Sequence, residues 1–246
     1  MNLDDLLKTW DGLGRIDPLW AILTEADKKG GRWNPEEFFA TGVHEVAALM
    51  ADVRSLGAAH GSRAALDFGC GVGRLTQPLA AHFAEVVGVD LSPSMIRQAQ
   101  QYNRRRDGCR YLVNDSPDLA RFSSGYFDFV LSYLTLQHIP PRYAKRYLQE
   151  FVRVVSSSGT ICFQVPSAPA AVSDALRMPV WRAKGTVRAL LARLGIGSGA
   201  KIAMYGISRD SVCRLLEEAG ARLVDVAPAD EFTPGWRGYR YIATKE

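Results

Sequence analysis

The sequence predicts an α/β protein whose core is a doubly wound, mostly parallel sheet of seven strands. From residue 63 onward, short apolar runs alternate with amphipathic helical segments, which is the pattern of a parallel sheet covered by helices on both faces. Hydrophobic residues make up 47% of the 246 residues and charged residues 23%, as in ordinary globular proteins. The chain is therefore expected to fold around one such sheet, with additions.

The seven strands are expected where apolar runs lie between turn signals, and the last strand is expected to run antiparallel to the others. Each of the intervening helices carries an apolar stripe at helical spacing. The strands are predicted at 64–68, 85–90, 110–114, 126–132, 159–165, 222–226 and 239–244, and the helices at 75–83, 92–106, 142–155 and 208–219.

Residues 1–60 are expected to form a helical cap ahead of the sheet domain, which is assigned to residues 61–246. Leu3, Leu6, Leu7 and Trp10 recur at helical spacing, and a short helix follows at 18–23. A third helix is predicted from Asn34, which can cap it, to residue 56. Residues 166–205 break the regular pattern and are interpreted as an insertion after the fifth strand.

Composition and charge argue against several classes of protein. The formal net charge of +4 is too mild for a dedicated nucleic-acid binder. The acidic N-terminus lacks the apolar run of a secretory signal, and no stretch approaches the ~18 apolar residues of a membrane-spanning helix. These features favour a cytoplasmic protein without stable membrane insertion.

The four cysteines also give no sign of a metal or disulfide framework. They are widely scattered and form no CxxC pair, and no cluster of acidic residues and histidines stands out, so no metal is expected. These cysteines are Cys70, Cys109, Cys162 and Cys213.

A glycine-rich loop lies between the first predicted strand of the sheet and the helix that follows it. Gly69, Gly71 and Gly73 allow a tight backbone turn and close approach of a ligand. Asp90 ends the next strand about 20 residues later, where a carboxylate can bind two ribose hydroxyls. Arg74 stands where a GxGxxG loop has its third glycine, and no Gly-Lys-Ser/Thr follows, which excludes a P-loop. A turn without a ligand and a nicotinamide site are the alternatives.

These residues resemble the motifs of class I S-adenosylmethionine (SAM)-dependent methyltransferases, which have a Rossmann-like fold. The resemblance is firm from residue 63 to 165 and loose beyond, and Ser157-Ser158-Gly159 replaces the usual Pro-Gly-Gly turn. The matching segments are 67–73 (motif I), 89–95 (motif II), 114–119 (beside the adenine), 127–132 and 136–139 (fourth strand and its continuation), and 153–160.

The resemblance implies SAM as the cofactor. The loop glycines would flank its methionyl part, Asp90 would hold the ribose hydroxyls, and Asp115 would accept a hydrogen bond from the adenine amino group. Met95 or Leu91 could pack on the adenine. The alternatives are that Met95 belongs to the core and that Asp115 forms a turn. The cofactor-binding residues expected on this basis are Asp67, Gly69, Gly71, Gly73, Asp90, Leu91, Met95, Asp115, Ser116 and Ser132.

His138 is the candidate general base, because it follows the fourth strand near the edge where open α/β sheets bind ligands. The alternative is that it only fixes the loop before Pro140. Tyr133, Trp236 and Tyr239, together with His138, are expected to line the acceptor pocket, with a place in the core as the alternative for Tyr133.

Two flanking segments have open roles. The N-terminal aromatic residues could cover the cofactor or simply pack on the sheet edge. The basic insertion suits an anionic or sugar-like acceptor, with a membrane surface or a solvated face as alternatives. The residues concerned are Trp33, Phe38 and Phe39 in the first segment and Arg177, Arg182, Lys184, Arg188, Arg193 and Lys201 in the second.

The expected function is methylation of a small molecule, most simply at a hydroxyl of a sugar or secondary metabolite. N-methylation of a small molecule, an RNA or protein methyltransferase, a non-enzymatic SAM-binding scaffold and a nicotinamide oxidoreductase are the alternatives. Residues 132–135 read Ser-Tyr-Leu-Thr, where many amino-methylating enzymes of nucleic acids carry Asn/Asp-Pro-Pro-Tyr/Phe. The sequence leaves the oligomeric state open.

Overall fold

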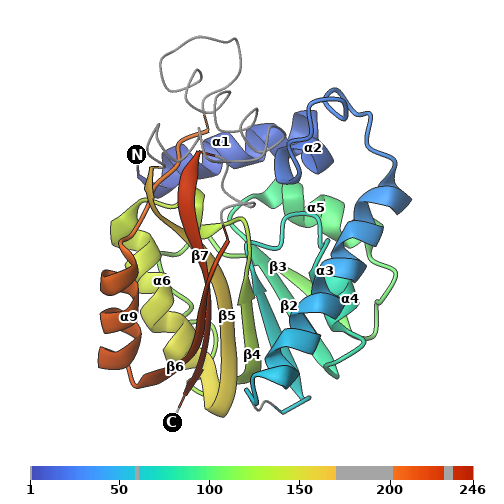
Figure 1. Ribbon diagram of the computed structural model, residues 1–246. Helices are drawn as coiled ribbons and strands as arrows, with labels where there is room; N and C mark the ends of the chain where they lie inside the picture. Colours follow the sequence, from blue (N-terminus) through green and yellow to red (C-terminus); the bar gives the residue numbers. More distant parts are fainter. Residues whose placement is uncertain (1, 59–60, 170–201, 230–234, 246) are drawn as a thin grey trace.

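The computed structural model describes residues 2–58, 61–169, 202–229 and 235–245. Its centre is a seven-stranded sheet in the order β3-β2-β1-β4-β5-β7-β6 (Figure 1). Strands β1 to β5 pair in parallel, and β7 pairs antiparallel with both β5 and β6. The predicted doubly wound sheet and its antiparallel last strand are confirmed. The strands are β1 (Ala64–Phe68), β2 (Glu85–Asp90), β3 (Cys109–Val113), β4 (Phe127–Ser132), β5 (Val155–Pro169), β6 (Ala221–Pro228) and β7 (Trp236–Lys245).

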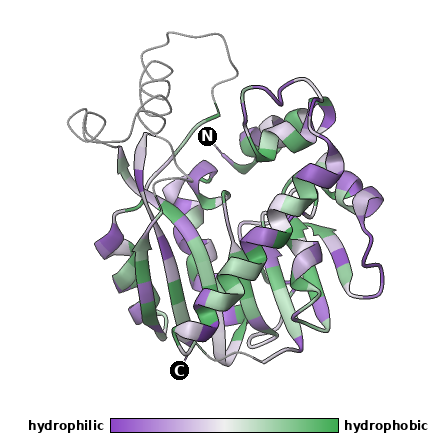
Figure 2. Cartoon of the chain, turned by 45° about the vertical axis from the view of Figure 1, so that its right-hand side comes forward, coloured by the Kyte–Doolittle hydropathy of each residue, from purple (hydrophilic) through white to green (hydrophobic). Residues whose placement is uncertain are grey.

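Helices cover both faces of the sheet. One face packs against α6 and α9, and the other against α3, α4 and α5. Strands β1 and β4 are buried along their whole length, and the central strands are mostly hydrophobic in Figure 2. The helices are α1 (Leu3–Ile16), α2 (Pro18–Ile22), α3 (Pro35–Ser55), α4 (Thr76–Leu79), α5 (Pro93–Tyr102), α6 (Pro141–Val154) and α9 (Arg209–Glu218), with a 3-10 turn η1 (Leu136–His138).

Side-chain caps set the starts of several helices where the sequence predicts them. Asn34 accepts hydrogen bonds from the backbone of Glu36 and Glu37, and Ser92 accepts one from Met95. None of the helices in the described residues has both the length and the apolar character needed to cross a membrane.

Two predicted helices are too long. The helix expected at 75–83 ends at Leu79, after which the backbone bonds to carbonyls three residues back, as in a 3-10 turn. Pro78 lacks an N–H and Leu75 offers no capping side chain, so this segment has little to hold an α-helix. The helix expected at 92–106 ends at Tyr102, because Asn103 bonds through its side chain to Arg105 N and Cys109 O.

The fifth strand is longer than predicted. It continues to Pro169 and pairs there with β7, so regular structure extends into the segment interpreted as an insertion. Residues 170–201 of that segment, which include the basic residues from Arg177 to Lys201, lie outside the described residues. The division of the chain at residue 60 stays a prediction.

Helices α1 and α2 cross one end of the sheet, above the loops that follow β1 and β2 (Figure 1). The buried side chain of Asp11 in α1 accepts from the backbone N–H of Ser94 at 2.7 Å, close to the start of α5. The hydroxyl of Ser92 lies 3.3 Å from the same carboxylate oxygen. The Asp11 carboxylate thus stabilises the packing of α1 against the N-terminal end of α5.

The N-terminal aromatic residues, which could cover the cofactor or pack on the sheet edge, lie between α2, α3 and the glycine loop. Trp33 and Phe38 are buried in a small cluster with Leu19, Val72 and Met95, and Phe39 packs against it. This arrangement ties α2 to α3 and to the glycine loop.

Candidate active site

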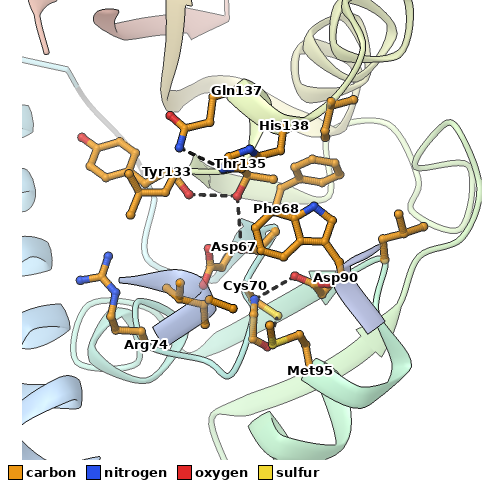
Figure 3. A pocket seen from close by; sticks show the side chains of 18 of the residues that line it. Asp67, Phe68, Cys70, Arg74, Asp90, Met95, Tyr133, Thr135, Gln137 and His138 are labelled. Carbon is orange, nitrogen blue, oxygen red and sulfur yellow. Dashed lines mark hydrogen bonds between the residues drawn. The ribbon is translucent and has the colours of Figure 1, made fainter. Parts of the chain in front are cut away.

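A cavity of about 470 Å³ opens at the carboxyl ends of β1, β2 and β4, and residues of α1 and α2 also line it. Figure 3 shows side chains that line this cavity. Its size is typical of a small-molecule or cofactor site. We call it the cofactor cavity. The residues that line it are Leu3, Leu6, Trp10, Ala21, Ile22, Leu23, Thr24, Glu25, Asp67, Phe68, Gly69, Cys70, Gly71, Arg74, Leu75, Val89, Asp90, Leu91, Met95, Asn114, Tyr133, Leu134, Thr135, Gln137, His138, Ile139, Tyr147, Ile202 and Met204.

The glycine loop forms one wall of this cavity. Gly71 has a positive φ of 53°, and a Cβ there would lie 2.5 Å from Ile22 Cδ1 of α2. Gly69 also has a positive φ, and a Cβ there would collide with Thr135. The loop therefore needs glycine both for its backbone conformation and for close contact with α2 and with the segment after β4.

Asp90 holds the same loop in place. Its Oδ2 accepts from Gly71 N at 2.9 Å, and its Oδ1 accepts from Ser92 N at 2.8 Å. Each carboxylate oxygen keeps a second lone pair for a ligand hydroxyl. Burial raises the pKa of Asp90 in spite of these backbone hydrogen bonds. The arrangement suits a diol such as ribose.

Asp67 places a second carboxyl group in the cavity wall. Burial raises its pKa to about 6, although a hydrogen bond from Thr76 at 2.6 Å and the charge of Arg74 both lower it. The Arg74 guanidinium itself pairs with Glu45 at 2.6 Å. A cationic ligand beside Asp67 would favour the ionised carboxylate.

His138 lies in the opposite part of the cavity from Asp90 and Met95 in Figure 3. Its Nδ1 is 3.1 Å from the carbonyl oxygen of Ala203, which can only accept, so Nδ1 carries the proton. The Gln137 amide donates to Nε2 at 3.1 Å. Burial lowers the pKa of His138 to about 4, so the imidazole is neutral at pH 7 and its basic atom is Nε2.

Several other predicted site residues lie in the same cavity wall. Leu91, Met95 and Tyr133 line it together with Asp67, Gly69, Gly71, Asp90 and His138. The sequence thus brings residues from the ends of three strands to one place. Their roles in binding or catalysis remain predictions.

The remaining predicted residues lie outside the lining. Gly73 turns toward Tyr111, and Asp115 does not line the cavity. The Ser116 hydroxyl donates to the Asp118 carboxylate, and the Ser116 carbonyl accepts from the Tyr147 hydroxyl. The Ser132 hydroxyl is fully buried and has no hydrogen-bond partner in the described part of the chain. In β7, Trp236 stands beside Gly206, and Tyr239 packs against Tyr241 and Arg209.

Sequence reasoning missed several lining residues. Trp10 was assigned only to a helix, yet its ring lies 5.0 Å from that of His138. Gln137 lies in the matched segment 136–139 and Asn114 in the segment 114–119 expected beside the adenine; neither is among the predicted site residues, but both line the cavity. The helical spacing of Leu3, Leu6 and Trp10 was a usable signal, since one face of α1 had to be buried.

Metal ligands are not gathered in this region. Among residues 2–58, 61–169, 202–229 and 235–245, no group of three or more His, Cys, Asp or Glu side chains is placed to hold an ion.

Part of the chain matches known proteins in sequence. Residues 66–163 match the family model described as a methyltransferase domain. Ubiquinone biosynthesis O-methyltransferase of Methylococcus capsulatus is 29% identical over 132 residues, which cover 53% of this chain and 54% of that protein. The enzyme of the same name from Chromobacterium violaceum is 30% identical, with 44% and 47% covered. The chain thus spans about half the length of the curated relatives it matches.

Solved structures agree in fold. Magnesium protoporphyrin IX methyltransferase from Synechocystis, crystallised with bound SAH, superposes over 100% of both chains with a TM-score of 0.67 and 19% identity. A SAM-dependent methyltransferase from Clostridium acetobutylicum gives a TM-score of 0.56 at 15% identity, over 80% of this chain and 89% of that one. Residues 66–163 thus match a methyltransferase domain, and the chain shares the fold of these SAM-dependent methyltransferases.

Proposed function

We propose that this protein transfers the methyl group of SAM to a hydroxyl of a small molecule, such as a sugar or a secondary metabolite. The observation that carries the proposal is one cavity that joins the Asp90-braced glycine loop to a neutral, hydrogen-bonded His138. The O-methyltransferase names of the curated relatives support a hydroxyl acceptor.

The residues of the cavity suit an adenosyl sulfonium. Asp90 offers free lone pairs to ribose hydroxyls, and Asp67 offers a carboxylate to the cationic part. The apolar side chains of Leu91 and Met95 lie in the same wall and would pack against adenine. When bound, SAM supplies an electrophilic methyl group whose transfer needs little beyond accurate positioning.

His138 would act on the acceptor. With Nδ1–H held by Ala203, Nε2 can accept the proton of an acceptor hydroxyl that replaces the Gln137 amide. Because burial keeps the pKa of His138 near 4, the imidazole is unprotonated at neutral pH, but the same shift makes it a weak base. Its contribution would therefore come from accurate positioning beside the acceptor hydroxyl. Trp10 and Ile139 line the same cavity.

The proposal is tested by calorimetric titration of the full chain with SAM and with NAD, followed by transfer of labelled methyl groups to a panel of sugars, phenols and amines. We expect binding of SAM and labelling of a hydroxyl. His138→Ala should lower kcat by about 10²–10⁴-fold and leave the Kd for SAM unchanged. His82, which lies outside the cavity lining, is the matched control for replacement by alanine. Absence of SAM binding would refute the proposal, and full turnover by His138→Ala would refute the assigned base.

A further inference from the structure

A second cavity, of about 450 Å³, lies between α3 and the face of the sheet formed by β5, β6 and β7. We call it the α3 cavity. It adjoins the cofactor cavity, because Tyr133 lines both and because Glu45 in its wall pairs with Arg74 of the cofactor cavity. Its lining residues are His44, Glu45, Ala48, Leu49, Asp52, Tyr133, Gln164, Ala227, Pro228, Ala229 and Arg240.

Gln164 of β5 is the unusual feature of this wall. Only 4% of the residue is exposed, and neither its amide nitrogen nor its amide oxygen has a hydrogen-bond partner in the described part of the chain. Leaving a buried polar group unpaired costs about 1–3 kcal/mol, so native proteins rarely do so without a reason. A ligand that both donates to the Gln164 oxygen and accepts from its nitrogen would supply that reason.

Two further buried polar atoms belong to residues of the same wall. Arg240, which stands opposite Gln164 in the pairing of β5 with β7, has an unpaired Nε. Glu45 has an unpaired Oε1, although its Oε2 accepts from Arg74. Together with the Gln164 amide, these atoms make two donors and two acceptors. Hydroxyl groups match such a mixed set, since each one both donates and accepts.

The charges of the wall point to a neutral ligand. Glu45 pairs with Arg74 at 2.6 Å, and Asp52 pairs with Arg240 at 2.5 Å. Arg240 also approaches Asp225 at 3.4 Å. Since each of these carboxylates has an arginine partner, an anionic or cationic ligand would gain little here and would lose its hydration.

We propose that the α3 cavity binds the part of the methyl acceptor remote from the reacting hydroxyl, and that this part is neutral and carries neighbouring hydroxyl groups that bond to Gln164. The proposal rests on the methyl transfer proposed above. Its geometric basis is Tyr133, which directly follows β4 and lines both cavities. A molecule in the α3 cavity therefore lies one side chain away from the cofactor cavity.

The test uses the full chain saturated with SAH and two neutral probes, methyl glucoside and catechol, beside their charged counterparts glucuronate and dihydroxybenzoate. The side-chain amide signals of Gln164, assigned by their loss in Gln164→Leu, are followed by NMR during each titration. We expect a neutral probe to shift these signals and to bind about tenfold more tightly than its charged counterpart. Unshifted signals with both neutral probes, or tighter binding of the charged ones, would overturn the proposal.

The variant Gln164→Leu supplies a second readout. It should weaken binding of the neutral probe about tenfold, leave the Kd for SAH unchanged, and keep or raise the melting temperature, because it removes an unpaired buried amide. Gln101→Leu, at an exposed position of α5, is the matched control. Unweakened probe binding by Gln164→Leu would overturn the proposal. Failure of the proposed function would be seen separately, as absence of SAM binding in the unaltered chain.

Discussion

Replacing Asp11 with alanine should weaken the docking of α1 on α5, although the hydrogen bond from the Ser94 hydroxyl to the backbone oxygen of residue 11 remains. The change removes a charged acceptor from Ser94 N at 2.7 Å and a weaker contact with Ser92 Oγ at 3.3 Å. A hydrogen bond to a charged group contributes ~1.5–3 kcal/mol, so the two together should contribute roughly 2–4 kcal/mol to docking of the helix. The backbone amides of α1 should then exchange with solvent roughly 30- to 1,000-fold faster.

The assay is amide hydrogen exchange measured by mass spectrometry, combined with titration by SAM. Leu3, Leu6 and Trp10 of α1 line the cavity, so the Kd for SAM should also rise in Asp11→Ala. The fold-increase in Kd should not exceed the fold-increase in the exchange rate of the α1 amides. The exchange rates and the Kd for SAM of Asp11→Asn should lie between those of the unaltered chain and Asp11→Ala, since asparagine keeps an acceptor but loses the charge. Lys8→Ala, at an exposed position of the same helix, is the control. Unchanged exchange of α1 in Asp11→Ala would refute the reasoning.

Two further predictions concern the cavity wall formed by Gly71 and Asp67. Gly71→Ala should lower the free energy of unfolding by about 1–2 kcal/mol because of its positive φ, as should the control Gly57→Ala, whose added methyl meets no atom within 4 Å. When both variants are compared by urea unfolding and SAM titration, only Gly71→Ala should also weaken SAM binding, and equal affinities would contradict the role of the Ile22 contact. The pKa of Asp67, raised by burial to about 6, predicts that SAM affinity rises with pH by up to tenfold per unit below pH 6 and levels off above it. The same shift predicts that the free energy of unfolding falls as the pH rises from about 4 to 6, because the folded state binds the Asp67 proton more tightly than the unfolded state does. Calorimetry across this range should show both trends, and persistence of either in Asp67→Asn would exclude Asp67 as their source.

The sheet and the glycine loop were predictable because their signals are local. Apolar runs such as 64–68 and 127–132 are buried on both faces, and the loop glycines are fixed by backbone sterics. Helix ends were less predictable, since the ends at Leu79 and Tyr102 depend on Pro78 and on the Asn103 side chain. The contacts of Asp11 with Ser94 and the unpaired state of Gln164 join residues from distant segments, so no local pattern signals them.

The contact between Trp10 and His138 links helix α1 to the candidate base. Helix α1 both encloses the cofactor cavity and contributes to the dry surroundings that keep the imidazole pKa low. A chain with α1 displaced would expose the imidazole to water, and its pKa would return toward the ordinary value of about 6.5. Loss of the helix would then appear in a pH–rate profile as a new titration near neutrality, not only as weaker cofactor affinity.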